Sequence, residues 1–90
     1  MFKMEASVEG RKVVLRLSGR IQATHLEQLR APLGKNMRSL ALDLEEVTLV
    51  DIDVVRFLGT CESQGIELRH CAPYIREWIL RESARNDHNF

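Results

Sequence analysis

The segment Leu40-Ala41-Leu42-Asp43-Leu44 is almost continuously apolar, and it constrains the fold of this chain more than any other feature. A strand with one face in water alternates apolar and polar residues, whereas a strand covered on both faces reads as an apolar run. The segment therefore predicts an inner strand of a sheet. Glu45 and Glu46 interrupt the run, and Val50 closes the apolar stretch that follows them.

The first residues predict a β-hairpin. Residues 2–8 alternate apolar and polar side chains in their first half, and Glu9-Gly10 is typical of a tight turn. Val13–Leu17 then forms a second strand, which we expect to end at Gly19.

The spacing of Leu26, Leu29 and Leu33 predicts a first helix. Thr24 is the expected N-cap, with Glu27 as the matching acid of a capping box, and the helix is expected to close near Gly34.

Two more helices and one strand follow the apolar segment. Asp51 or Asp53 can cap the second helix, which should stop near Gly65. Residues 66–71 alternate as a short strand, and Pro73 suits the first turn of a third helix. Inside the second helix, Gly59 indicates either close packing against a neighbouring element or a kink.

The resulting order, β-β-α-β-α-β-α, predicts an α/β domain with a mixed, mostly parallel four-stranded sheet. We expect this domain to span residues 1–80. Charged residues and Asn dominate residues 81–90, which predicts a flexible C-terminal tail. So short a chain cannot cover both faces of its sheet equally, which leaves a face or an edge open for docking or for a homodimer.

The charge balance excludes several classes of partner. Thirteen Lys and Arg residues match thirteen Asp and Glu residues, so there is no positive field to hold a nucleic acid or a membrane surface. No stretch approaches the roughly 20 apolar residues of a membrane span. We therefore expect a cytoplasmic protein that does not insert into the membrane.

The cysteines and histidines predict no metal and no cofactor. Cys61 and Cys71 are expected to stay reduced, because two thiols without an export signal seldom pair. His25, His70 and His88 are scattered without the spacing of a ligand set.

The element order, together with Leu15–Ile21 and Ala41–Asp51, resembles the STAS domain of bacterial anti-sigma factor antagonists. The resemblance extends over about residues 3–80, and it implies a shortened version, because family members usually continue with a further strand and helix. In that family an acid at the end of the central strand precedes a small residue, a phosphorylatable Ser or Thr, and Gly. This chain has Asp51-Ile52-Asp53-Val54 there.

Asp53 thus falls on the phospho-acceptor position, where it cannot accept phosphate from a kinase that acts on hydroxyls. It carries one negative charge, whereas a phosphoserine carries about 1.5 to 2. Three interpretations stay open. Asp53 holds the domain in a fixed, partly phosphate-like state, its partner surface accepts a permanent acid, or Asp53 is a simple N-cap of the second helix.

The resemblance implies a non-catalytic, partner-switching module that binds an anti-sigma factor or kinase-like protein. The expected partner-binding residues surround the start of the second helix: Asp51, Ile52, Asp53, Val54, Arg56 and Thr60.

Two alternatives remain for this sequence. One is an accessory subunit of a membrane transporter, a role known in single-domain relatives of the family. The other is a Mg²⁺-dependent phosphatase that uses Asp51 and Asp53, although such chemistry also needs a phosphate-holding cation and further acids. No Lys follows Asp53 in the chain.

Overall fold

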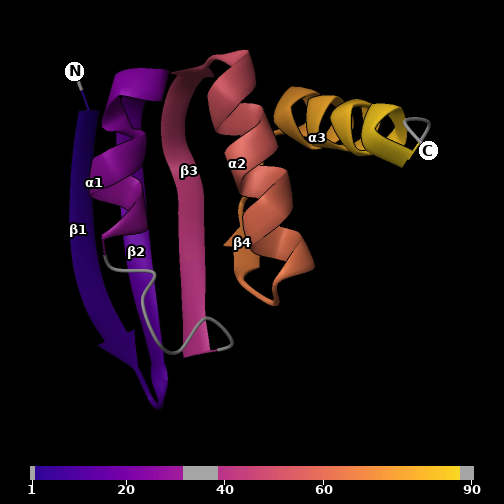
Figure 1. Ribbon diagram of the computed structural model, residues 1–90. Helices are drawn as coiled ribbons and strands as arrows, with labels where there is room; N and C mark the ends of the chain where they lie inside the picture. The colour runs from indigo at the N-terminus through magenta and orange to yellow at the C-terminus, as the bar shows by residue number, and fades with distance from the viewer. Residues whose placement is uncertain (1, 32–38, 88–90) are drawn as a thin grey trace.

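The computed structural model describes residues 2–31 and 39–87. Figure 1 shows a sheet with its helices, in the order that the sequence predicts. The elements are β1 (Phe2–Glu9), β2 (Lys12–Ile21), a 3₁₀ turn (Ala23–His25), α1 (Leu26–Arg30), β3 (Leu40–Val50), α2 (Ile52–Ser63), β4 (Glu67–Arg69) and α3 (Pro73–Asp87).

The four strands form one mixed sheet in the order β1-β2-β3-β4. β1 and β2 pair antiparallel, with Glu9 opposite Lys12 beside the turn, and β2–β3 and β3–β4 pair parallel. Gly10 adopts a φ of 61° in that turn, a conformation that glycine takes without steric cost. The predicted α/β class and mixed, mostly parallel sheet are confirmed.

β2 continues beyond its predicted end, because it does not stop at Gly19 but reaches Ile21, which is fully buried. β3 ends at Val50, as the sequence predicts, and Glu45 and Glu46 do not interrupt it. The pairing of β2 with β3 shifts register twice, between Arg16 and Ser18 and again after Gly19. These irregularities absorb the extra residues, so the ladder continues where the local pattern predicts a break.

The first helix differs from its prediction. Thr24 lies inside the 3₁₀ turn and does not cap α1. The turn is held instead by the backbone N–H of Gln22, which donates to Nδ1 of His25 at 3.0 Å. Leu29 is buried, as the spacing requires. The predicted Leu33 and the helix end near Gly34 lie outside the described residues.

The core lies between the sheet and its helices. Helices α1 and α2 lie over one face of the sheet, and α3 packs against α2 (Figure 1). At the α2–α3 contact, a Cβ on Gly59 would meet Cγ2 of Ile79 at 3.4 Å, so the predicted close packing is present. Deeply buried apolar side chains of this core come from the sheet and from each α-helix: Leu17, Ile21 and Leu42 from the sheet, Leu29 from α1, Val54, Val55 and Leu58 from α2, and Ile75 from α3.

The other face of the sheet carries ion pairs. Leu68 packs against the core, so its neighbours Glu67 and Arg69 point to the opposite face. There Glu67 contacts Lys12 at 2.7 Å, and Arg69 contacts Glu9 at 3.0 Å. The structure thus leaves one face without helices among the described residues, as the short chain length suggests.

Helix α3 continues past Leu80 to Asp87, through residues for which the charge pattern predicts fraying. Within this segment, Glu82 is only 7% exposed and accepts a hydrogen bond from Nε of Arg56 on α2 at 3.1 Å, so the segment has a packing contact that the charge pattern does not indicate. The domain limit at residue 80 remains a prediction, but the helix does not end there. No helix among the described residues is long and apolar enough to cross a membrane.

Candidate functional site

The junction between β3 and α2 is organised by Asp51. Val50 ends the strand, and Asp51 is the N-cap of the helix. Its Oδ1 accepts a hydrogen bond from the backbone N–H of Val54 at 3.0 Å, and its Oδ2 accepts one from the backbone N–H of Ala23 at 2.9 Å. One carboxylate therefore caps α2 and ties it to the segment that leads into α1.

Asp53 has a different role, because it lies inside the first turn, beyond the cap. It is exposed in the first turn of α2, and Asp51 provides the cap hydrogen bond. The interpretation of Asp53 as the N-cap is therefore wrong. Its charge near the positive end of the helix dipole is favourable, and its carboxylate faces solvent.

The remaining predicted partner-binding residues divide into surface and core. Ile52, Arg56 and Thr60 are accessible, and the Thr60 hydroxyl donates to the carbonyl of Arg56 at 3.0 Å. Val54 is 0% exposed and belongs to the hydrophobic core. Val54 is therefore removed from the candidate contact surface, because the helix turns that residue toward the sheet.

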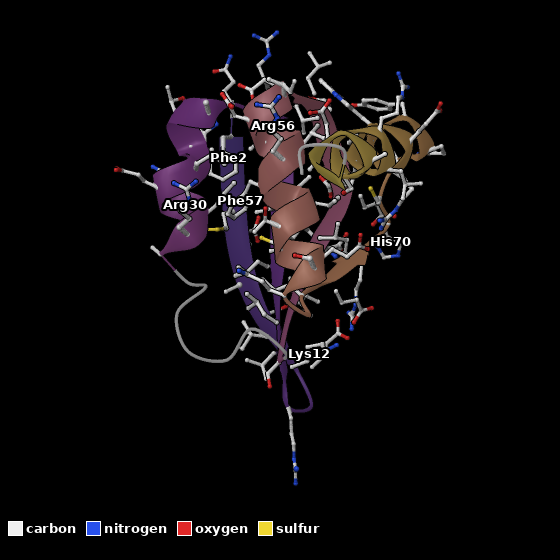
Figure 2. All side chains as sticks on the ribbon, turned by 45° about the vertical axis from the view of Figure 1, so that its right-hand side comes forward. Phe2, Lys12, Arg30, Arg56, Phe57 and His70 are labelled. Carbon is white, nitrogen blue, oxygen red and sulfur yellow. The ribbon has the colours of Figure 1, made fainter. Side chains whose placement is uncertain are left out.

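A groove of about 540 Å³ runs between α1 and α2 beside these residues. Asp53, Arg56 and Thr60 line it, together with Arg30 and Phe57, which the sequence did not single out. The guanidinium of Arg30 lies 5.7 Å from the centre of the Phe57 ring. Figure 2 shows Arg30 on α1 and Phe57 and Arg56 on α2. Arg30 reaches this groove because the two helices pack side by side. The residues around Arg30 in the sequence do not predict this position.

Exposed apolar side chains surround the same junction. Leu49 is 51% exposed and Ile52 is 38% exposed, and they lie on either side of the Val50-Asp51 step. Tyr74 of α3 is 47% exposed, and its hydroxyl donates to the carbonyl of Thr48 at 3.1 Å. We call Leu49, Ile52, Asp53 and Tyr74 the junction surface. It combines apolar area with an exposed acid, a composition suited to protein contact.

A second polar cluster forms at the end of β4. The Oδ1 atom of buried Asp43 lies 3.1 Å from Nδ1 of His70 and accepts the backbone N–H of Glu45 at 3.0 Å. Nε of Arg16 lies 3.7 Å from the other Asp43 oxygen. Burial alone would raise the pKa of Asp43, but the Glu45 N–H, His70 and Arg16 outweigh it and hold that pKa below its ordinary value.

Asp43, Glu45 and His70 are the described residues whose ligand atoms gather closely enough to hold a metal ion. The sequence does not indicate this group, because His70 joins it only through strand pairing. Its backbone adopts a φ of 55°, which is uncommon for a residue with a side chain. The nearby Arg16 cation opposes a metal ion at this position, so the cluster is better described as an ion-pair network.

Comparisons with known proteins address the fold. No protein-family model matches the sequence, and no curated protein matches it significantly. Among solved structures, the anti-sigma factor antagonist SpoIIAA in its unphosphorylated form has a TM-score of 0.61 and 18% identity over 100% of both chains. The antisigma-factor antagonist STAS domain from Rhodobacter sphaeroides has a TM-score of 0.59 and 16% identity, over 77% of this chain and 86% of that one.

The fold is that of STAS domains. The expected STAS architecture is therefore confirmed, while the low sequence identities leave its function to be argued from the site. In this STAS fold, the junction surface lies where the central strand β3 passes into α2.

Proposed function

We propose that this STAS-fold chain is a non-catalytic module that binds a protein partner through the junction surface. The observation that carries the proposal is the exposed carboxylate of Asp53, with the exposed apolar side chains of Leu49 and Ile52 within four residues of it in the chain. Because a rim charge mainly steers and orients a partner while apolar contacts supply affinity, the fitting partner presents an apolar patch with a basic group opposite Asp53.

The permanence of this charge is the second part of the proposal. In the anti-sigma factor antagonists that this chain resembles, the residue at position 53 carries a hydroxyl that is phosphorylated. Here the residue is an Asp, whose negative charge no kinase adds. We infer that the chain has one fixed binding state at this position. An anti-sigma factor or kinase-like protein is the partner class that the resemblance favours.

The geometry argues against catalysis by Asp51. Both oxygens of its carboxylate accept backbone hydrogen bonds, from Val54 and Ala23, so this group has a structural role at the start of α2. An aspartyl phosphatase also needs a cation that holds the phosphate and further acids for Mg²⁺, and no Lys follows Asp53 in the chain. Assays with p-nitrophenyl phosphate and Mg²⁺ should therefore give no turnover, and turnover lost in Asp51→Asn would contradict this part of the proposal.

The binding experiment starts with the wild-type chain as bait in its native cells. The recovered protein is then purified, and its affinity is measured by calorimetry against Ile52→Asp, Asp53→Lys and the control Glu77→Lys. Glu77 is an exposed residue of α3 outside the junction surface. We expect Ile52→Asp and Asp53→Lys to weaken binding about tenfold or more, and Glu77→Lys to leave it unchanged.

The outcomes separate the candidates. If the recovered protein binds Asp53→Lys as tightly as it binds wild type, the junction surface is not the binding site. Recovery of a transporter subunit would support the accessory role in place of the anti-sigma partner. For regulation, Asp53→Ser is the informative variant, because it restores a hydroxyl. If it neither becomes phosphorylated by a recovered kinase nor changes affinity, the fixed-state interpretation fails.

A further inference from the structure

Strand β1 is an open edge of the sheet. Among the described residues it pairs with β2 alone, and it is the outermost strand in Figure 1. Alternate residues of such a strand direct N–H and C=O groups away from the sheet, where they are available to another strand. With eight residues, β1 is longer than the common strand length of about five to six, so this edge is substantial.

The charged side chains along this edge are arranged so that they can pair with those of a second copy. Lys3 and Glu5 share one face of the strand, with Nζ and Oε1 at 3.2 Å and exposed side-chain fractions of 69% and 60%. Phe2 and Met4 share the other face and pack against the core. A strand that places one cation and one anion two residues apart on one face can meet an antiparallel copy of itself with opposite charges facing.

We propose that two copies of this chain associate through β1, antiparallel, with Met4 of one copy opposite Met4 of the other. In this register Lys3 of each copy faces Glu5 of the other copy, and Phe2 faces Ala6. The two-fold axis is then perpendicular to the sheet, so the helices of both copies lie on the same side of one continuous sheet.

The other registers are poorer for stated reasons. A shift of one residue would place the charged face of one copy beside the apolar face of the other. Centring the pair on Lys3 or on Glu5 places like charges directly opposite each other. Centring it on Ala6 brings Lys3 to Glu9, whose carboxylate already lies 3.0 Å from Arg69, and leaves Glu5 without a cation.

The inference is independent of the proposed function, because the junction surface contains no residue of β1. The experiment measures self-association by sedimentation equilibrium for wild type, Lys3→Glu, Glu5→Lys and the exchanged double variant K3E/E5K. Circular dichroism verifies that each variant is folded, and Glu77→Lys is the control for a charge reversal elsewhere on the surface.

Each single reversal creates two like-charge pairs in the dimer, so we expect its dissociation constant to rise about tenfold or more. K3E/E5K restores two opposite pairs and should return to the wild-type value. An equimolar mixture of Lys3→Glu and Glu5→Lys is the most discriminating test of this register. In the mixed dimer, positions 3 and 5 are both acidic in one copy and both basic in the other, so every facing pair has opposite charges. The mixture should therefore associate more tightly than either variant alone.

Three results would overturn the inference. The first is a wild-type chain that stays monomeric up to about 1 mM, where even an interface of small area gives detectable dimer. The second is a dimer whose dissociation constant does not respond to Lys3→Glu or Glu5→Lys. The third is a mixture that associates no more tightly than the separate variants, since that would exclude the Met4-centred register.

Discussion

Asp51 and Ala23 are joined by a hydrogen bond of 2.9 Å between the Asp51 Oδ2 atom and the Ala23 backbone N–H. The other oxygen of the same carboxylate caps α2 through the N–H of Val54. A single side chain thus satisfies two backbone donors in segments that are distant in the sequence. The start of α2 and the entry to α1 are consequently held in one geometry.

Replacing Asp51 by Ala should lower the free energy of unfolding by about 1 to 3 kcal/mol, because both a helix cap and a second hydrogen bond are lost. The matched control is Asp53→Ala, which removes an exposed charge from the same helix turn and should cost less than about 1 kcal/mol. Urea unfolding followed by circular dichroism measures both. Equal losses in the two variants would contradict the assignment of the cap to Asp51.

Glu82 should contribute more to the free energy of unfolding than its place in a charged segment suggests. Its side chain is 9% exposed and contacts Arg56, whereas Glu77 in the same helix is 71% exposed and contacts Arg81 at 3.4 Å. Glu82→Gln should therefore lower the free energy of unfolding by about 1 to 2 kcal/mol, and Glu77→Gln by no more than about 0.5 kcal/mol. Thermal unfolding of the two variants compares them directly, and a smaller loss for Glu82→Gln would be the contrary result.

The stabilisation contributed by Asp43 should depend on pH in the acid range. The folded-state pKa of Asp43 lies below its ordinary value of 3.8, so the folded state binds a proton less readily than the unfolded state. Its contribution is therefore fully present above about pH 5 and is lost as the pH falls through the lowered pKa. Protonation removes the charge that Arg16 and His70 stabilise.

We expect the difference in unfolding free energy between wild type and Asp43→Asn to be larger at pH 5 than at pH 3. It should shrink as the pH falls below 3.8, the ordinary pKa of this group. Urea unfolding at four pH values gives the comparison. A difference that stays constant to pH 3, or that grows there, would rule out this role of the carboxylate.

The two thiols should differ in reactivity. Burial raises the pKa of Cys61 to about 11, and its side chain is buried, whereas Cys71 is partly exposed. The thiolate is the reactive form, so Cys61 should resist Ellman's reagent at pH 7.5 until the chain unfolds. Cys71→Ser should thus react only in denaturant, while Cys61→Ser should react slowly in the native state. Rapid native labelling of Cys71→Ser would show that the core opens at Cys61.

The local patterns were sufficient for much of the candidate site. The turn at Gly10 and the inner strand that begins at Leu40 each depend on a few adjacent residues, and the structure has both. The sequence leaves the cap of α2 open between Asp51 and Asp53, and the structure assigns it to Asp51. Proximity in the sequence does not predict the burial of Val54, because exposure on a helix depends on the face on which a residue lies.

By itself, the sequence determined the order of strands and helices and the faces they bury, because periodicity and capping are properties of neighbouring residues. Tertiary structure alone decided the continuation of β2 beyond Gly19, the approach of His70 to Asp43, and the burial of Glu82 against Arg56. These contacts join residues far apart in the chain. Their stability arises from desolvation and pairing energies that exist only after the elements have packed.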